Sequence, residues 1–326
     1  MQTATGVLEN AGTIRNAGVH RESGRVTYFP IPYSGESLRS LLGRYLLRTG
    51  ECLHSSSFGL AASGSWLSPM PRNIRGMAER LDPSWGFTVE NLVVEHTLLP
   101  YITAFAPEPV RRAIGSDAVG ERSCYRRGVQ YGAAAPLPSG WRFCPLCLAS
   151  DLATYGEAHE HLEHMIHGVT ACAVHGVRFV TIGNRGLGAI HLPQPPSILQ
   201  TARQHANDET VVATTVQQSI ARRSAWVLER GDALSYGALQ AALRTVMGSS
   251  ACGLKCKTAG FASWLALHDV PAVILTVPSY LDTLIAYLVD NVPCRWPPST
   301  ALVVALLEYL RIPMETLLAS TASGRS

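Results

Sequence analysis

The sequence is short of lysine and of long apolar runs, and each shortage narrows the class of protein. Lys255 and Lys257 are the only lysines among 27 basic residues, so basic surfaces must be built from arginine, which suits phosphate recognition. The longest apolar runs, 270–277 and 301–307, fall far short of the roughly 20 residues needed to cross a bilayer. The N-terminus lacks the basic and then apolar regions of a secretory signal. We therefore expect a cytoplasmic protein without a membrane partner.

Common catalytic patterns are also missing. Gly248 and Gly253 have the spacing of a phosphate loop, but Leu254 stands where lysine should follow. No G-x-S-x-G nucleophile elbow is present, and the acidic residues are too scattered for a carboxylate two-metal centre. The segment 159–167 misses the zinc-hydrolase motif because Glu163 replaces its second histidine. These absences indicate a non-catalytic protein and leave a hydrolase on 159–167 as the least favoured alternative.

What the chain does contain is a high apolar content. Hydrophobic residues make up 47% and charged residues 16% of 326 residues, which indicates a globular protein with a sizeable core. This composition is also compatible with a broad partner surface or a homodimer. The net charge of +3 discriminates little. The eight cysteines suggest metal ligands and buried thiols in a reducing compartment, because the clearest of them are closely paired.

Those pairs carry the strongest signal in the sequence. Cys144 and Cys147 are separated by two residues, and Cys172 and His175 repeat this spacing further along the chain. Two such knuckles supply the tetrahedral shell of thiolates and imidazole that zinc prefers. Three sulfurs and one nitrogen fill all four positions and leave none for a catalytic water. We therefore predict one closed, structural zinc ion bound by Cys144, Cys147, Cys172 and His175.

Periodic apolar residues predict a mainly α protein. The clearest stripe lies in a helix over 38–50, and Arg39, Arg44 and Arg48 lie mostly off that stripe. Further helices are expected at 72–81, 89–99 with Thr88 as its cap, 107–114, 151–167, 211–230, 235–247 with Ser235 as its cap, 259–268, 279–291 and 298–310.

The predicted elements fall into an N-terminal helix-turn-helix-like bundle, a structural zinc-finger core and a C-terminal all-helical, helix-turn-helix-like domain. Plain helical bundles would give the same pattern, so both interpretations stay open at this point. A Pro-rich stretch suggests the main linker. The predicted divisions are a flexible tail at 1–27, the N-terminal helical region at 28–120, the zinc-finger core at 121–192, the linker at 193–210 and the C-terminal helical domain at 211–326.

Arginines gather on the approach to the zinc-finger core and are candidates for nucleic-acid contacts. They could bind phosphate, and the alternative is an ordinary solvated surface. The candidates are Arg111, Arg112, Arg122, Arg126, Arg127 and Arg142.

Two further groups could bind metal, and for both the simpler interpretation is favoured. The histidines at 159, 161, 164 and 167 fit a polar helix face with one or two packed imidazoles better than a second metal site, and His164 has the best claim to a structural role. The second group, Cys252, Cys256 and Cys294 with His268, has an atypical spacing that favours buried or free thiols.

Three groups of residues, in order along 28–180, resemble one protein family. They are Pro32…Gly35-Glu36-Ser37-Leu38…Leu42-x-Arg44, then His96-Thr97-Leu98-Leu99-Pro100-Tyr101…Phe105, and then Arg142-Phe143-Cys144-Pro145-x-Cys147-Leu148…Asp151…Tyr155-Gly156…His164…Gly168-Val169-x-x-Cys172-x-x-His175-Gly176. This order is similar to the TniQ/TnsD family of transposon target-selection proteins. Leu41, His161 and His167 depart from the family pattern, at positions that are not zinc ligands.

The resemblance implies an N-terminal helix-turn-helix, a zinc-finger TniQ core and a C-terminal helical region. It also implies a role as a target-site adaptor, which recognises target DNA directly or through an RNA-guided targeting complex. Its implied partners are the AAA+ ATPase regulator and the transposase of the transposon, and it carries no transposition chemistry itself. The alternative is a stand-alone zinc-containing DNA-binding transcriptional regulator.

Overall fold

A computed structural model describes residues 25–51, 73–120, 141–182, 210–248, 251–270 and 299–318, with only the backbone described at 141 and 251–258. The described chain is mainly helical, as predicted. Several predictions lie outside the described residues: most of the tail 1–27, almost all of the linker 193–210, the helix at 279–291, the side chains of Cys252 and Cys256, Cys294, and Arg122, Arg126 and Arg127.

The N-terminal helices pack around one apolar core. Ser37 caps α1 by accepting a hydrogen bond from the Ser40 amide, and α1 ends at Gly50, whose φ of 67° is left-handed. Thr88 caps α3 in a capping box, as its sequence position predicts. Side chains including Leu41, Leu42 and Ile74 form the core. The elements are α1 (Leu38–Thr49), α2 (Ile74–Ala78), η2 (Pro83–Trp85), α3 (Val89–His96), α4 (Leu99–Thr103) and α5 (Glu108–Val119).

The segment that carries the two knuckles differs from the sequence prediction. Strands β1 (Trp141–Phe143) and β2 (Val180–Ile182) pair antiparallel, with Arg142 opposite Thr181. Helix α7 (Pro145–Tyr155) begins after Cys144, and a short 3-10 helix, η3 (Leu162–Met165), follows later. The predicted helix over 151–167 is therefore wrong.

A glycine and a backbone pairing explain this difference. Gly156 adopts a left-handed φ of 74° and ends α7. The chain that follows then uses its backbone to bind the start of α1: the Ser37 amide donates to the Glu160 carbonyl at 2.9 Å, and Glu36 forms a β-bridge with His161. Tertiary pairing thus overrides the helical tendency of the segment.

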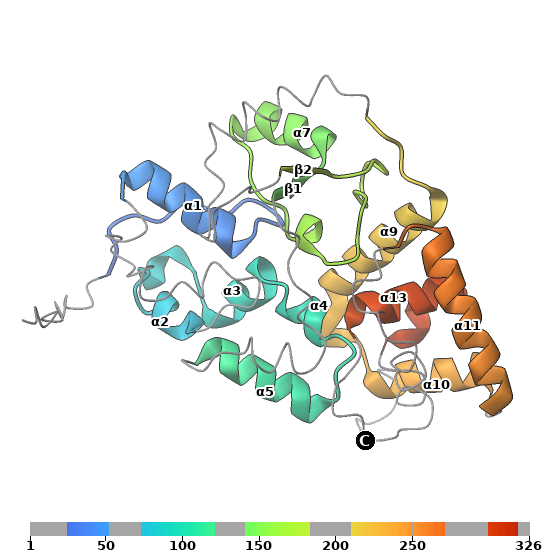
Figure 1. Cartoon of the computed structure of the whole chain (residues 1–326). Coiled ribbons are helices and arrows are strands. Elements are labelled where there is room, and N and C mark those ends of the chain that lie inside the picture. The colour runs from blue at the N-terminus through green and yellow to red at the C-terminus, as the bar shows by residue number, and fades with distance from the viewer. Residues whose placement is uncertain are drawn as a thin grey trace, which may run out of the picture.

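The C-terminal helices share a core with the middle of the chain. The elements are α9 (Thr215–Arg230), η4 (Gly231–Ala233), α10 (Tyr236–Met247), α11 (Ala251–Leu267), α13 (Thr300–Tyr309) and η5 (Met314–Leu317). Figure 1 shows α4 beside α9 and α13, and these helices are in contact. Side chains such as Phe105, Ile166 and Val303 belong to this one core. The core therefore draws on three of the regions predicted above, whose boundaries remain predictions.

Helix α13 is apolar on almost every side because it is surrounded by protein. Val303, Val304 and Leu307 have no exposed surface, which is typical of a core helix. Ser299 caps this helix by accepting a hydrogen bond from the Leu302 amide. Among the described residues, no helix combines the length and apolarity needed to cross a membrane.

Candidate metal centre

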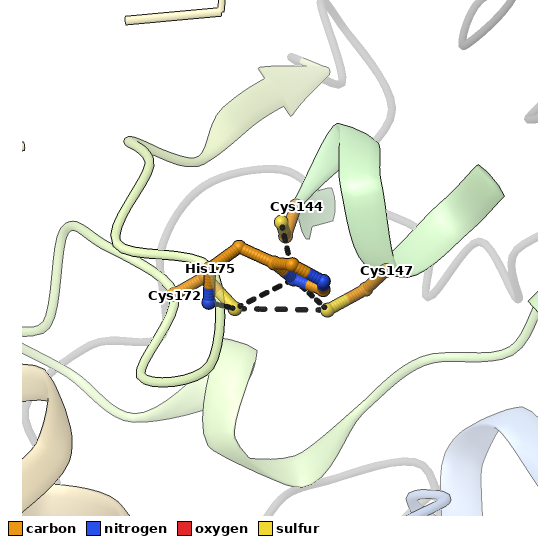
Figure 2. A group of neighbouring side chains, drawn as sticks. All are labelled: Cys144, Cys147, Cys172 and His175. Atoms are coloured by element: carbon orange, nitrogen blue, oxygen red, sulfur yellow. Dashed lines mark hydrogen bonds between the residues drawn. The ribbon is translucent and has the colours of Figure 1, made fainter. Parts of the chain in front are cut away.

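The first knuckle is formed by the junction of β1 and α7. Cys144 follows the strand directly and occupies the N-cap position of α7, with Pro145 at the first helical position. Cys147 lies in the first turn of the same helix. A strand that ends where a helix begins turns both thiols to the same side, and Figure 2 shows them facing the other knuckle.

The second knuckle is a tight turn. The Gly176 amide donates to the Cys172 carbonyl at 3.0 Å, and the Cys172 amide donates to the Val177 carbonyl at 2.9 Å. Gly176 has a left-handed φ of 65°, and a Cβ there would meet the Gln218 side chain at 3.1 Å, so glycine suits the turn. The His175 amide points to the Cys172 sulfur at 3.4 Å. This turn places Cys172 Sγ and His175 Nδ1 opposite the first knuckle.

The four predicted ligands come together with a spacing that fits a tetrahedral ion (Figure 2). His175 Nδ1 lies 3.5, 3.3 and 3.6 Å from the sulfurs of Cys144, Cys147 and Cys172, and the sulfurs of Cys147 and Cys172 are 3.6 Å apart. A zinc ion with bonds of ~2.3 Å to sulfur and ~2.0 Å to nitrogen separates its donors by about 3.5–3.8 Å. The same spacing excludes a disulfide, whose sulfurs are about 2.05 Å apart.

The electrostatics of the cluster also fit a cation. Cys144 and Cys172 are buried with no exposed surface, whereas His175 reaches the protein surface. Hydrogen bonding with Cys147, and then with Cys172, lowers the pKa of Cys144, whereas hydrogen bonding with Cys144, and then with Cys172, raises the pKa of Cys147. Three neighbouring thiolates repel one another, so all three thiols can ionise together only beside a positive ion. The donor set and its burial fit a closed metal site.

His164 supports the centre from behind. Its side chain is buried, lies 4.7 Å from the Phe179 ring between centroids, and forms a hydrogen bond with Cys172. Burial lowers the pKa of His164 to about 4, against this hydrogen bond. A neutral imidazole that donates to a ligand sulfur orients that sulfur. This position agrees with the structural role predicted for His164.

Two of the arginines predicted to contact nucleic acid donate hydrogen bonds to backbone carbonyls within the fold. The Arg142 guanidinium donates to the carbonyls of Val169 at 2.6 Å and Ile166 at 2.8 Å, and burial lowers its pKa to about 10. The Arg111 guanidinium donates to the backbone carbonyls of Ala104 at 2.9 Å and Leu234 at 3.0 Å. These hydrogen bonds use groups that would meet a phosphate, so a phosphate would have to compete with them, and phosphate contact at Arg111 and Arg142 stays a prediction.

Arg112 keeps the surface position that a phosphate contact needs. Its side chain is 73% exposed and forms a salt bridge with Glu108 at 3.2 Å, an arrangement that solvent screens. A phosphate could therefore replace Glu108 as its partner without unpairing a buried charge.

A buried ion-pair network joins the metal-binding segment to α1, and the sequence reasoning missed it. Arg44 binds Glu36 at 2.6 Å and Glu157 at 2.9 Å, and Arg48 also binds Glu157. The Arg39 side chain binds Glu160, with its Nε 3.0 Å from Oε2. The available signal was three arginines off the apolar stripe of one helix, which the sequence alone could not pair with glutamates more than 100 positions away.

Hydroxyl and backbone groups complete this network. Ser37 Oγ donates to Glu160 at 2.7 Å, Ser40 Oγ donates to Glu36 at 2.9 Å, and the Tyr33 amide donates to Glu36 at 3.0 Å. Buried charges stabilise a fold only when they are paired and hydrogen-bonded. The network meets both conditions, so it fixes the orientation of α1 against the metal-binding segment.

The segment that contains α1 and the two knuckles is similar to known proteins. Residues 27–179 match the family model described as TniQ. The chain is 27% identical over 158 residues to the transposon Tn7 transposition protein TnsD of Escherichia coli. This alignment covers 45% of the chain and 30% of that relative, so the chain spans less than a third of the relative's length. The matched segment contains α1, the ion-pair network and all four candidate ligands.

Proposed function

We propose that this member of the TniQ/TnsD family, which matches the family through residues 27–179, selects target sites for DNA transposition. In this proposal it acts as a non-catalytic adaptor. It recognises target DNA or an RNA-guided DNA-targeting complex and recruits the AAA+ ATPase regulator and the transposase of its transposon. The observation that carries the proposal is the TniQ match across the whole segment that links α1 to the metal centre.

The geometry of the centre supports a scaffolding role. Cys144, Cys147, Cys172 and His175 would hold one zinc ion, and four protein donors leave no position for substrate or a reactive water. When bound, zinc supplies a rigid cross-link between the two knuckles. An adaptor needs this kind of rigidity, because it must present two sets of contacts in a fixed relative position.

The buried network extends that rigidity to α1. Glu157 and Glu160 lie between the knuckles in the sequence and bind Arg44 and Arg39 of α1. A partner bound to the N-terminal helices is thus held in a set orientation relative to the knuckles. This linkage supports a protein that connects two partners more than it supports a simple DNA-binding module.

Nucleic-acid contact in this proposal falls to the arginines that the fold does not use. Arg112 is exposed among the described residues, and Arg122, Arg126 and Arg127 remain predicted contacts. Arginines on a surface bind phosphates without reading the base sequence. Replacing Arg112 by Ala should weaken DNA binding and reduce its salt dependence by about one ion, whereas Arg111→Ala should lower the stability of the fold.

A transposition assay with mapped insertion sites tests the proposal. Cells carry the transposon ends, the transposase and the ATPase, with or without this chain, and the insertions are sequenced. We expect the chain to concentrate insertions at one site or one class of sites, and His175→Ala to abolish this bias while His268→Ala keeps it. Unchanged insertion sites, together with tight binding of the purified chain to its own promoter DNA, would instead support the transcriptional regulator.

A further inference from the structure

A second cluster of metal-binding side chains lies between the two knuckles in the sequence. Asp151 of α7, His159 and His161 each offer one ligand atom, and these atoms lie within 4.8 Å of one another. His161 Nε2 is 2.9 Å and His159 Nδ1 is 3.5 Å from the same oxygen, Oδ2 of Asp151. The cluster shares no residue with the cysteine centre.

We propose that Asp151, His159 and His161 form a second site for a divalent transition-metal ion, independent of the cysteine centre. Two imidazoles and one carboxylate are a donor set that suits zinc, cobalt(II), nickel(II) or iron(II). Donors at ~2.1 Å from one ion are separated by about 3.0–3.4 Å. The observed distances of 2.9 and 3.5 Å lie close to that range, so an ion fits after small side-chain movements.

The state of His159 points to a ligand. Its side chain is 1% exposed, and its ring nitrogens have only weak polar contacts with the described residues: Nδ1 lies 3.5 Å from Asp151 Oδ2, and the backbone of Ser34 is the other polar neighbour. A buried polar group that is poorly paired destabilises a fold. A metal ion would give one of the His159 ring nitrogens a strong partner.

The surroundings hold the cluster in place and leave one side open. The His159 ring lies between Tyr33, at 5.2 Å, and His161, at 4.1 Å between ring centroids. His161 lines a cavity of about 660 Å³, together with Glu163 and other residues. Solvent in this cavity reaches His161, so a water molecule can complete the coordination of an ion with three protein ligands.

An ion at this position would have a structural consequence. Asp151 belongs to α7, whereas His159 and His161 lie on either side of Glu160, which binds α1. Metal binding would therefore connect the segment 159–161 to α7 and stabilise the contact between α1 and the metal-binding segment. Without the ion, the hydrogen bond between His161 and Asp151 connects this segment to α7.

Metal stoichiometry and cobalt spectroscopy test the site. The purified full chain is stripped of metal, reloaded with excess zinc, dialysed and analysed by elemental mass spectrometry. We expect about two zinc ions per wild-type chain and about one per chain of the double variant Asp151→Asn, His161→Gln. His268→Ala is the matched histidine control and should retain about two zinc ions per chain. One ion per wild-type chain, or two in the double variant, would overturn the proposal.

Cobalt(II) provides a second measurement on the wild-type chain, in case the double variant fails to fold. Thiolate ligands give cobalt an intense charge-transfer absorption that imidazoles and carboxylates do not. After the cysteine centre is saturated, the second equivalent of cobalt should bind without increasing that absorption. A second equivalent that increases it would assign the ion to further cysteines and overturn the proposal.

Discussion

Arg44 Nη1 lies 2.6 Å from Glu36 Oε2, and both side chains are buried. Arg44 also stacks over the Tyr33 ring at 3.8 Å and donates to the Ile31 carbonyl at 3.1 Å. One buried guanidinium thus joins the lead-in to α1, the start of α1 and the segment after α7. This ion pair is the centre of the network that orients α1.

Replacing Glu36 should therefore destabilise the protein strongly. Glu36→Ala leaves Arg44 buried with only part of its partners, and breaking one side of a buried ion pair lowers the free energy of unfolding by about 3–5 kcal/mol. Glu108→Ala is the matched control, because its partner Arg112 is exposed and such pairs contribute about 0–1 kcal/mol. Urea unfolding followed by circular dichroism measures both. Equal effects of the two substitutions would contradict the role given to the network.

Gly231 lies where the backbone of the C-terminal helices approaches the backbone of α4 closely. A Cβ at Gly231 would lie 2.2 Å from the carbonyl oxygen of Pro100, at the junction of α4 with the start of η4. Backbone atoms on both sides cannot move apart without separating α4 from α9. Gly231→Ala should therefore lower the free energy of unfolding by at least about 2 kcal/mol.

A second glycine supplies the control for this substitution. Gly237 lies in α10, and the nearest atom to a Cβ there is Ser235 Oγ at 3.7 Å, an ordinary contact. Gly237→Ala should raise stability by about 0.5–1 kcal/mol, because alanine favours a helix more than glycine does. A melting temperature raised by both substitutions would contradict the prediction, because it would show that the Pro100 backbone can move to accommodate the new methyl group.

The parts of the fold that depend on local sequence could be predicted. Apolar periodicity predicted α1, and the caps Thr88 and Ser235 predicted the starts of α3 and α10. The ligand set came together because two short turns determine the direction of each pair, whatever lies between them. Local chemistry was sufficient in these cases.

The parts that depend on distant contacts could not be predicted. The stretch after Gly156 has helix-forming residues, but its backbone pairs with Glu36 and Ser37. In the sequence, Arg142 is a plausible surface cation, but in the structure its guanidinium donates to the carbonyls of Ile166 and Val169. A single sequence does not reveal which of its charges will be buried, since burial is decided by packing.

Substitution of His175 tests the metal centre directly. His175→Ala removes one of four donors, and we expect loss of the zinc ion and unfolding of the segment 141–182, because metal binding contributes on the order of 10 kcal/mol to such small units. His175→Cys should retain zinc, since four thiolates also form a closed tetrahedral site. Zinc release followed with a colorimetric chelator distinguishes the two variants. Retention of this zinc by His175→Ala would contradict the assignment.

His96 should make stability depend on pH. Its Nδ1 lies 2.8 Å from the Glu36 carbonyl oxygen, and burial, acting against this hydrogen bond, lowers the pKa of His96 below its ordinary 6.5. The folded state therefore binds a proton less readily than the unfolded state does. The stabilising contribution is fully present above pH 6.5 and is lost as the pH falls from there towards the lower folded pKa.

A variant that keeps the hydrogen bond isolates this effect. Asparagine places a side-chain N–H near the position of Nδ1 and does not titrate, so His96→Asn should flatten part of the loss of stability between pH 7 and pH 5. Unfolding free energies measured at half-unit pH intervals compare the two chains. The wild-type curve should fall more steeply over this interval, because only its His96 must remain uncharged to stay buried. Parallel curves would mean that His96 is protonated without penalty and that other groups set the acid sensitivity of the fold.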